Sequence, residues 1–175
     1  LPLSVLRPPR LVGRAAALQQ LAAGWQAGQV LCVAGEAGLG KSRLLGDWAT
    51  ALGPCAVAAA RPGDVVQPYA ALSRLVQAVI DRFTPPIDTA DALQAARLLP
   101  RLASLAGATV APVRTDHERH LALLALARWL ASALRRGCQA LVLDDLQFAD
   151  EASLAALRVL AMPDALPDVL PDALP

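Results

Sequence analysis

The sequence has few aromatic residues, few cysteines and histidines, and no long apolar run. Its 3 cysteines, Cys32, Cys55 and Cys138, are far apart and odd in number. They therefore indicate neither a disulfide framework nor a zinc site, and we expect them to be small buried apolar residues in a reducing compartment. The 2 histidines, His117 and His120, share one face of an expected helix without a third ligand nearby. That arrangement is typical of a solvated first helical turn rather than a metal centre.

The composition disfavours membrane and nucleic-acid partners. Although 55% of the 175 residues are hydrophobic and the mean hydropathy is +0.43, no stretch approaches the roughly 18 uninterrupted apolar residues of a membrane span. The opening "LPLSVLRPPRLVGR" has its prolines and arginines too close together for a signal peptide. A net charge of +1 provides no general field for nucleic acid or for a membrane surface. We expect a cytoplasmic location, no membrane contact and no direct nucleic-acid binding by this segment.

Apolar segments of strand type alternate with segments of helical periodicity. Apolar strands are expected at Gln29–Gly35, 55–60 and 138–145. Helices are expected after Gly13 up to Gly28, over 41–52, from Tyr69 to 83, within 90–99, over 115–136 and over 150–162. The alternation predicts a parallel sheet covered on both faces. Residues 1–10 are expected to be an irregular lead-in. Residues 163–175, "PDALPDVLPDALP", repeat proline every fourth residue, which predicts a disordered tail.

A glycine-rich loop follows the first expected strand and precedes a helix. Residues 35–42, "GEAGLGKS", fit the phosphate-loop (Walker A) pattern G-x-x-x-x-G-K-[ST]. Glycines let backbone N–H groups turn inward around phosphate oxygens, and the next helix adds the positive end of its dipole. Lys41, which is the only lysine, can reach the β and γ phosphates, and Ser42 can ligate Mg²⁺. The residues expected to bind the nucleotide here are Gly35, Glu36, Ala37, Gly38, Leu39, Gly40, Lys41, Ser42 and Arg43.

Two carboxylates end the third expected strand, "ALVLDD", in the manner of a Walker B motif. Because the carboxyl ends of parallel strands gather at the edge where such loops precede helices, Asp144 is expected to hold Mg²⁺ together with Ser42. Asp145 is expected to face the γ-phosphate, where a carboxylate can orient or activate water. The two motifs together predict a site for ATP or ADP with Mg²⁺, in which Asp145 and Lys41 are the catalytic residues.

Four segments, "LVGRAAALQQL", "GEAGLGKSRLL", "PYAALSRLV" and "LVLDDLQFADEASLAALRVL", follow the order found in multidomain signal-transduction (STAND) ATPases. The chain resembles most closely the ATPase domain of large LuxR-type transcriptional regulators, an Orc1-like AAA domain, up to about residue 162. The resemblance implies an α/β fold, namely a three-layer P-loop NTPase of the ASCE type with a parallel sheet, over residues 11–162. It also implies that Val12, Gly13 and Arg14 lie against the adenine.

The chain departs from that family pattern in two places. The glutamate that usually follows "GR" is Ala15. The usual "DDLHWAD" reads "DDLQFAD", with Gln147 and Phe148 in place of histidine and tryptophan. Both departures leave room for nucleotide binding.

These motifs predict a nucleotide-switch domain that binds MgATP and hydrolyses it slowly. The domain is expected to belong to a cytoplasmic signal-transduction or transcription regulator and to self-associate in the full-length parent. Two alternatives stay open: an inactive truncated fragment of such an ATPase, and an AAA-type replication or transposition helper ATPase. A small-molecule kinase would use the same loop, but no arginine-rich lid follows Asp145.

The resemblance further implies a fourth core strand between the loop strand and the strand that ends at Asp145. No apolar strand follows the helix that ends near Met162, so the sheet is expected to be truncated before this strand, with a gap of roughly 4.8 Å on each side. The 175-residue chain alone is therefore expected to aggregate or fold only in part, with ATPase activity near background. Thermal unfolding and ATPase assays of this chain beside a version extended by downstream sequence check the expectation. A monomeric short chain that melts cooperatively and turns over ATP would contradict it.

Overall fold

The computed structural model describes residues 13–87 and 89–161, and the chain divides into two compact units between Trp48 and Ala49. The expected lead-in, the expected tail at 163–175 and the candidate site residue Val12 lie outside the described residues.

The first unit holds helix α1 (Ala15–Gln26) and most of helix α2 (Lys41–Leu52), both predicted by sequence periodicity. α1 ends where predicted, because Gly28 adopts a left-handed φ of 68° and its N–H donates to the carbonyl of Trp25 at 2.9 Å. The rings of Trp25 and Trp48 pack edge to face, with centroids 5.7 Å apart and planes at 78°. This aromatic pair joins α1 to α2.

The segment between the two helices does not form the predicted strand. Residues 29–36 have no regular secondary structure, and the sheet found in the described residues consists of two strands of the other unit. Val30 is 73% exposed, so the predicted burial of Gln29–Gly35 is wrong as well. An apolar run becomes a strand only when a neighbouring backbone pairs with it, and no strand within the described ranges does so.

This segment instead approaches α1 closely. The N–H of Gln29 donates to the carbonyl of Gly24 at 3.0 Å. A Cβ atom built on Gly24 would lie only 2.5 Å from Cδ2 of Leu31. Gly24 therefore permits a contact between helix and segment that a larger residue would block.

Two parallel strands form the sheet of the second unit. Strand β1 (Cys55–Ala59) pairs with strand β2 (Ala140–Asp144), from Cys55 opposite Ala140 to Ala59 opposite Asp144. Both strands were predicted from sequence, and their parallel pairing with helices between them confirms the α/β class. The strand that ends in the two aspartates therefore lies beside the strand that precedes it in the chain.

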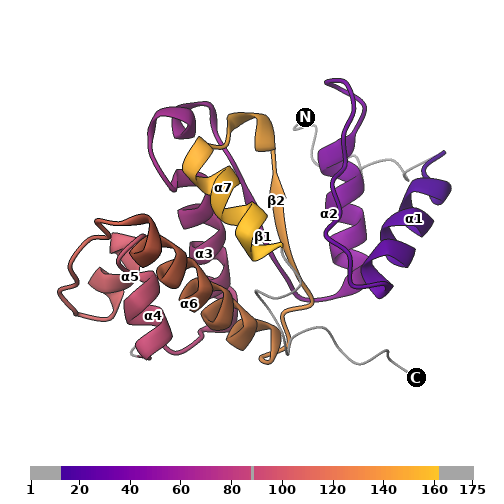
Figure 1. Cartoon of the computed structure of the whole chain (residues 1–175). Helices are drawn as coiled ribbons and strands as arrows, with labels where there is room; N and C mark the ends of the chain where they lie inside the picture. The colour runs from indigo at the N-terminus through magenta and orange to yellow at the C-terminus, as the bar shows by residue number, and fades with distance from the viewer. Residues whose placement is uncertain (1–12, 88, 162–175) are drawn as a thin grey trace, which may run out of the picture. The chain divides into compact units, whose positions relative to one another are not determined.

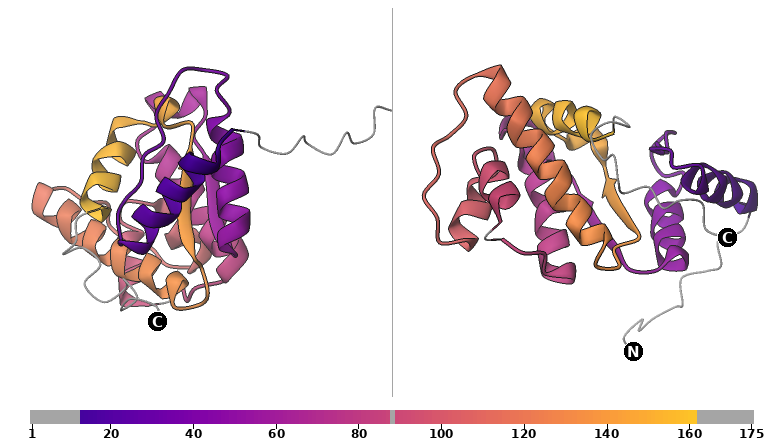
Figure 2. Two further views of the ribbon diagram at one scale, coloured as in Figure 1. Left: turned by 90° about the vertical axis from the view of Figure 1, so that its right-hand side faces the viewer. Right: turned by 60° about the horizontal axis from the view of Figure 1, so that its bottom comes forward.

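The helices of the second unit follow the predicted order. Between β1 and β2 come the 3₁₀ turn η1 (Pro62–Val66), α3 (Ala70–Phe83), α4 (Ala90–Ala95), α5 (Pro100–Leu105) and α6 (Asp116–Leu134), and after β2 come the 3₁₀ turn η2 (Leu146–Phe148) and α7 (Glu151–Leu160). Helices α3, α6 and α7 pack together on one side of the two strands (Figure 1). The short helix α4 lies beside α6 (Figure 2), and α5 packs against α4.

Small aliphatic residues and one tryptophan build the core of this unit. Ala56 of β1 and Leu72 and Val79 of α3 are fully buried, so the helix lies directly on the strand. Trp129 of α6 is also buried, and its indole N–H donates to the carbonyl of Pro86 at 2.8 Å. The bond satisfies the one polar atom of that ring and fixes α6 against the segment after α3.

The three cysteines divide into two kinds. Cys55 and Cys138 are buried as predicted, and this burial raises the pKa of both thiols. Cys32 is exposed, which contradicts the prediction, because residues 29–36 form no strand.

The start of α6 is fixed by a capping box at Thr115. The hydroxyl of Thr115 accepts the N–H of Glu118 at 3.1 Å, and Oε2 of Glu118 accepts the N–H of Thr115 at 3.2 Å. Arg97 donates to Oε1 of Glu118 at 2.7 Å, and the N–H of Arg114 donates to Oε2 at the same distance. The bonds from Arg97 and Arg114 lower the pKa of Glu118 to about 2. This acid therefore ties α6 to the segment between α4 and α5.

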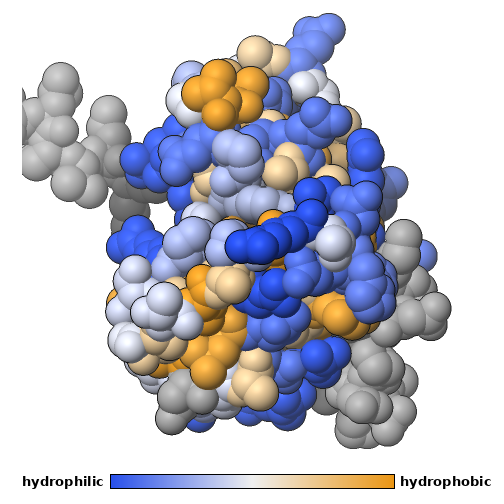
Figure 3. Space-filling view, turned by 60° about the vertical axis from the view of Figure 1, so that its left-hand side comes forward, coloured by the Kyte–Doolittle hydropathy of each residue, from blue (hydrophilic) through white to orange (hydrophobic). Residues whose placement is uncertain are grey.

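The face that carries α4, α5 and α6 is mainly hydrophilic. Hydrophobic side chains there form separate groups among hydrophilic ones (Figure 3). Leu105 of α5 and Leu121 of α6 are among the exposed apolar residues of these helices. No continuous apolar surface is visible over the described residues in this view.

Candidate functional site

The glycine-rich loop turns the chain directly into α2. Gly38 and Gly40 adopt left-handed φ values of 79° and 77°, which residues with a side chain rarely adopt. The N–H of Leu44 donates to the carbonyl of Gly40 at 2.9 Å, and this is the first bond of the helix. Helix geometry therefore leaves the N–H groups of Lys41 and Ser42 without an acceptor inside α2, available to an anion at the positive end of the helix dipole.

The side chain of Lys41 lies across the loop. Its Nζ donates to the carbonyl of Gly35 at 2.9 Å and to the carbonyl of Glu36 at 2.8 Å. These bonds connect the first two loop residues to the first residue of α2. The chain's only lysine is thus held at the mouth of the predicted phosphate loop.

Arg14, from the segment "LVGR", also reaches this loop. Its guanidinium donates to the carbonyl of Leu39. A hollow of about 40 Å³ lies here, and its walls come from Arg14, Val33, Ala34, Gly35, Leu39, Gly40, Lys41 and Leu44. The structure thus brings Arg14 to the residues predicted to bind the nucleotide, with Gly13 next to it in the chain.

The other predicted loop residues differ in their surroundings. Glu36, Ala37 and Ser42 are exposed on the loop and at the start of α2. The side chain of Arg43 instead donates from Nε to both carboxylate oxygens of Asp47, at 3.2 and 3.1 Å. That ion pair holds the side chain along α2. If Arg43 contributes to nucleotide binding, we therefore expect it to do so through its backbone.

In the second unit, the two predicted carboxylates lie at the end of β2. Asp144 is the last residue of the strand, and its Oδ1 accepts the N–H of Asp145 at 2.8 Å. Asp145 adopts a left-handed conformation (φ 54°, ψ 40°) that turns the chain into η2. Its carbonyl accepts the N–H of Phe148 at 2.9 Å, and its Oδ1 accepts the side-chain amide of Gln147 at the same distance.

The same loop ends in a buried acid that the sequence analysis did not single out. Asp150 caps α7, and its carboxylate accepts the N–H and the hydroxyl of Ser153 at 2.8 and 2.7 Å. It also accepts the N–H groups of Tyr69 and Ala71 at 2.7 and 3.2 Å. The hydroxyl of Ser153 accepts the N–H of Leu72 at 3.0 Å. Asp150 and Ser153 therefore join the start of α7 to the start of α3.

One half of this arrangement has a signal in the sequence. Aspartate is a favoured N-cap residue whose carboxylate accepts the N–H of the third helical residue, so the bond from the N–H of Ser153 to Asp150 could have been predicted. The link to Tyr69 spans 81 residues and has no local signal. Tyr69 adopts a left-handed φ of 61°, which is rare for a large side chain, and its bond to Asp150 helps to hold it there.

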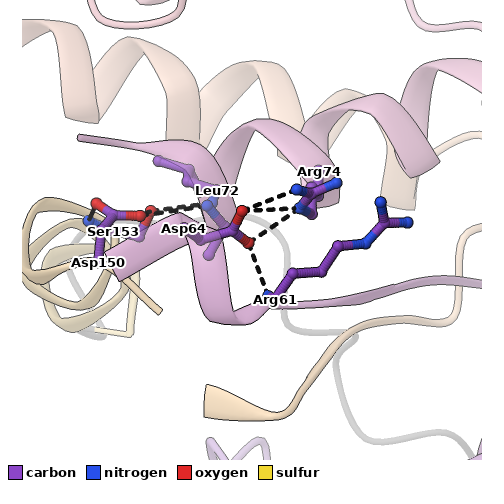
Figure 4. A network of polar contacts seen from close by, with 7 residues as sticks. Arg61, Asp64, Leu72, Arg74, Asp150 and Ser153 are labelled. Carbon is purple, nitrogen blue, oxygen red and sulfur yellow. Dashed lines mark hydrogen bonds and ion pairs between the residues drawn. The ribbon is translucent and has the colours of Figure 1, made fainter. Parts of the chain in front are cut away.

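A second buried acid fixes the turn after β1. Asp64 of η1 accepts the backbone N–H of Arg61 at 2.8 Å and the guanidinium of Arg74 at 2.8 Å (Figure 4). The hydrogen bond from Arg74 lowers the pKa of Asp64. Because η1 contacts η2, Asp64 and Asp150 together support the edge of the sheet that carries Asp144 and Asp145.

The first unit thus contains a glycine-rich loop that opens a helix, and the second unit contains two parallel strands, one of which ends in two aspartates. The model of the AAA ATPase domain matches residues 10–169, and the chain belongs to that family. No curated protein and no solved structure matches the chain. Among residues 13–87 and 89–161, no helix is long and apolar enough to cross a membrane. The same residues contain no group of three or more histidine, cysteine, aspartate or glutamate side chains that could hold a metal ion.

Replacement of Asp150 by alanine is expected to lower the free energy of unfolding by about 3 kcal/mol at pH 7, because several buried donors lose their acceptor. Urea unfolding of the full-length parent measures this change, and Glu151→Ala, which removes an exposed carboxylate from the same helical turn, is the matched control. Burial raises the pKa of Asp150, but its hydrogen bonds lower it further, so the pKa is below its ordinary value of 3.8 in the folded chain. The contribution of Asp150 is thus complete above that value and is lost as the pH falls below it. A variant as stable as the control at pH 7 would contradict this role.

Proposed function

We propose that this chain is the MgATP-binding, slowly hydrolysing switch domain of a cytoplasmic signal-transduction regulator of the LuxR type. Membership of the AAA ATPase family supports nucleotide binding. The order of the "LVGR", phosphate-loop, "PYAALSRLV" and "DDLQFAD" segments supports the regulator class. The observation that carries the proposal is the placement of Lys41 at the mouth of the loop.

The nucleotide phosphates are bound by the loop and by the start of α2. The N–H groups of Lys41 and Ser42 and the helix dipole favour an anion there. Lys41 exchanges the neutral carbonyls of Gly35 and Glu36 for phosphate oxygens, and a charged acceptor makes the stronger hydrogen bond. The remaining loop residues shape this cradle, and Gly13 and Arg14 lie on the adenine side.

Mg²⁺ is held by few protein oxygens. The hydroxyl of Ser42 and the carboxylate of Asp144 are oxygen donors of the kind that Mg²⁺ prefers. Two protein donors suit this ion, since Mg²⁺ usually takes one or two protein oxygens together with substrate phosphates and water. When bound, the ion neutralises charge that develops on the phosphates.

Asp145 orients and activates water for hydrolysis. Its Oδ1 is occupied by Gln147, and its Oδ2 accepts no hydrogen bond from the described residues. This second oxygen is the one that takes up the proton from water. The αL turn at Asp145 and the bond from Phe148 to its carbonyl hold the backbone that carries the carboxylate.

Lys41→Ala is expected to weaken ATP binding on the order of 100-fold, because a hydrogen bond to a charged group contributes roughly 1.5–3 kcal/mol. Titration with a fluorescent ATP analogue in the presence of Mg²⁺ measures the affinity. Arg136→Ala, which removes an exposed positive charge from the other unit, is the matched control and is expected to bind like the wild type. Equal affinities for Lys41→Ala and the wild type would mean that Lys41 and its loop do not bind the phosphates.

Asp145→Asn separates binding from chemistry. ATP affinity is expected to stay within a few-fold of the wild type, while turnover falls on the order of 100-fold, as expected for a lost general base. The full-length parent is the suitable protein, in case hydrolysis needs contacts between copies. Asp116→Asn, which alters an exposed acid at the start of α6, is the control. Unchanged turnover in Asp145→Asn would mean that water is activated elsewhere.

A further inference from the structure

We propose that Gln147 is a positioning residue that orients the carboxylate of Asp145 toward the attacking water. The proposal rests on the function assigned above to Asp145. It concerns a position where the resembling family usually has histidine, and the observation behind it is the 2.9 Å bond from Nε2 of Gln147 to Oδ1 of Asp145.

The backbone around Asp145 is already fixed without Gln147. Oδ1 of Asp144 accepts the N–H of Asp145, and the carbonyl of Asp145 accepts the N–H of Phe148. The N–H of Ala149 closes the next turn on the carbonyl of Leu146 at 3.0 Å. The freedom that remains at Asp145 is therefore rotation of its side chain.

Gln147 restricts this rotation. Among the described residues no other donor reaches the carboxylate of Asp145, which is only partly buried. With Oδ1 held, the carboxylate keeps one orientation and presents Oδ2. Ordering the side chain in advance reduces the entropy lost when water and nucleotide come together, and small errors in such placement reduce rates strongly.

The chemistry of the amide suits this role. A glutamine amide is a donor at every pH and takes no proton from water, so it leaves the proton transfer to Asp145. A neutral histidine ring also has one N–H donor, so it can make a bond of the same kind. Methionine matches glutamine in length and flexibility but supplies no donor at this position.

The first test compares turnover in three variants of the full-length parent. Gln147→Met is expected to lower kcat about tenfold with KM within about twofold, because the lost contact acts on the transition state rather than on binding. Gln147→His is expected to restore most of kcat, and Gln139→Met, at an exposed glutamine before β2, is expected to behave like the wild type. An unchanged kcat in Gln147→Met, or an equal loss in Gln147→His, would overturn the proposal.

The second test needs no turnover. In ¹H–¹⁵N spectra of the nucleotide-free protein, the side-chain amide of Gln147 is expected to differ from that of exposed Gln139 and to move toward it in Asp145→Ala. If the chemical shifts of the Gln147 side-chain amide are the same in Asp145→Ala as in the wild type, the proposal is also overturned. If Asp145→Asn keeps full turnover, the function proposed for Asp145 fails instead. If Asp145→Asn loses turnover while Gln147→Met does not, only the role of Gln147 fails.

Discussion

The arrangement of the second unit depends on the buried carboxylate of Asp150. It accepts hydrogen bonds from the start of α3 and from the start of α7, two helices that are distant in sequence. Asp150 also ends the loop that begins with Asp144 and Asp145, so the candidate site and the helix packing share one anchor. The ion pair of Asp64 with Arg74 supports the neighbouring turn in the same way. A polar network that is fully satisfied in the interior specifies one geometry, whereas apolar packing alone tolerates several.

Most of the fold followed from local patterns in the sequence. The apolar periodicity of α3 acts within one element, so it predicts a helix directly. The strands at 55–60 and 138–145 were predicted from apolar content and are present because each pairs with the other. The same content at Gln29–Gly35 led to a wrong prediction, because a strand also needs a partner and a local pattern does not supply one.

The candidate site was predictable in its motifs but not in its contacts. The spacing of the loop residues, and the two aspartates at the end of an apolar strand, indicate a phosphate loop and a metal-binding carboxylate from the sequence alone. The contact of Arg14 with Leu39 and the link from Tyr69 to Asp150 join residues 25 and 81 positions apart, and only the fold brings them together. Gln147 lies two residues from Asp145, but its bond depends on the left-handed turn at Asp145, which the sequence does not specify.

The central claim is that the loop from Gly35 to Ser42 binds nucleotide phosphates, and ligand-dependent thermal unfolding of the full-length parent tests it most directly. A ligand that binds the folded chain adds RT ln(1 + [L]/Kd) to its stability, about 2.7 kcal/mol at a hundred times Kd. The account predicts that Tm rises steadily with MgATP and much less with AMP, which lacks the β and γ phosphates that Lys41 is proposed to contact. A Tm that is independent of MgATP concentration, or an equal rise with AMP, would contradict it.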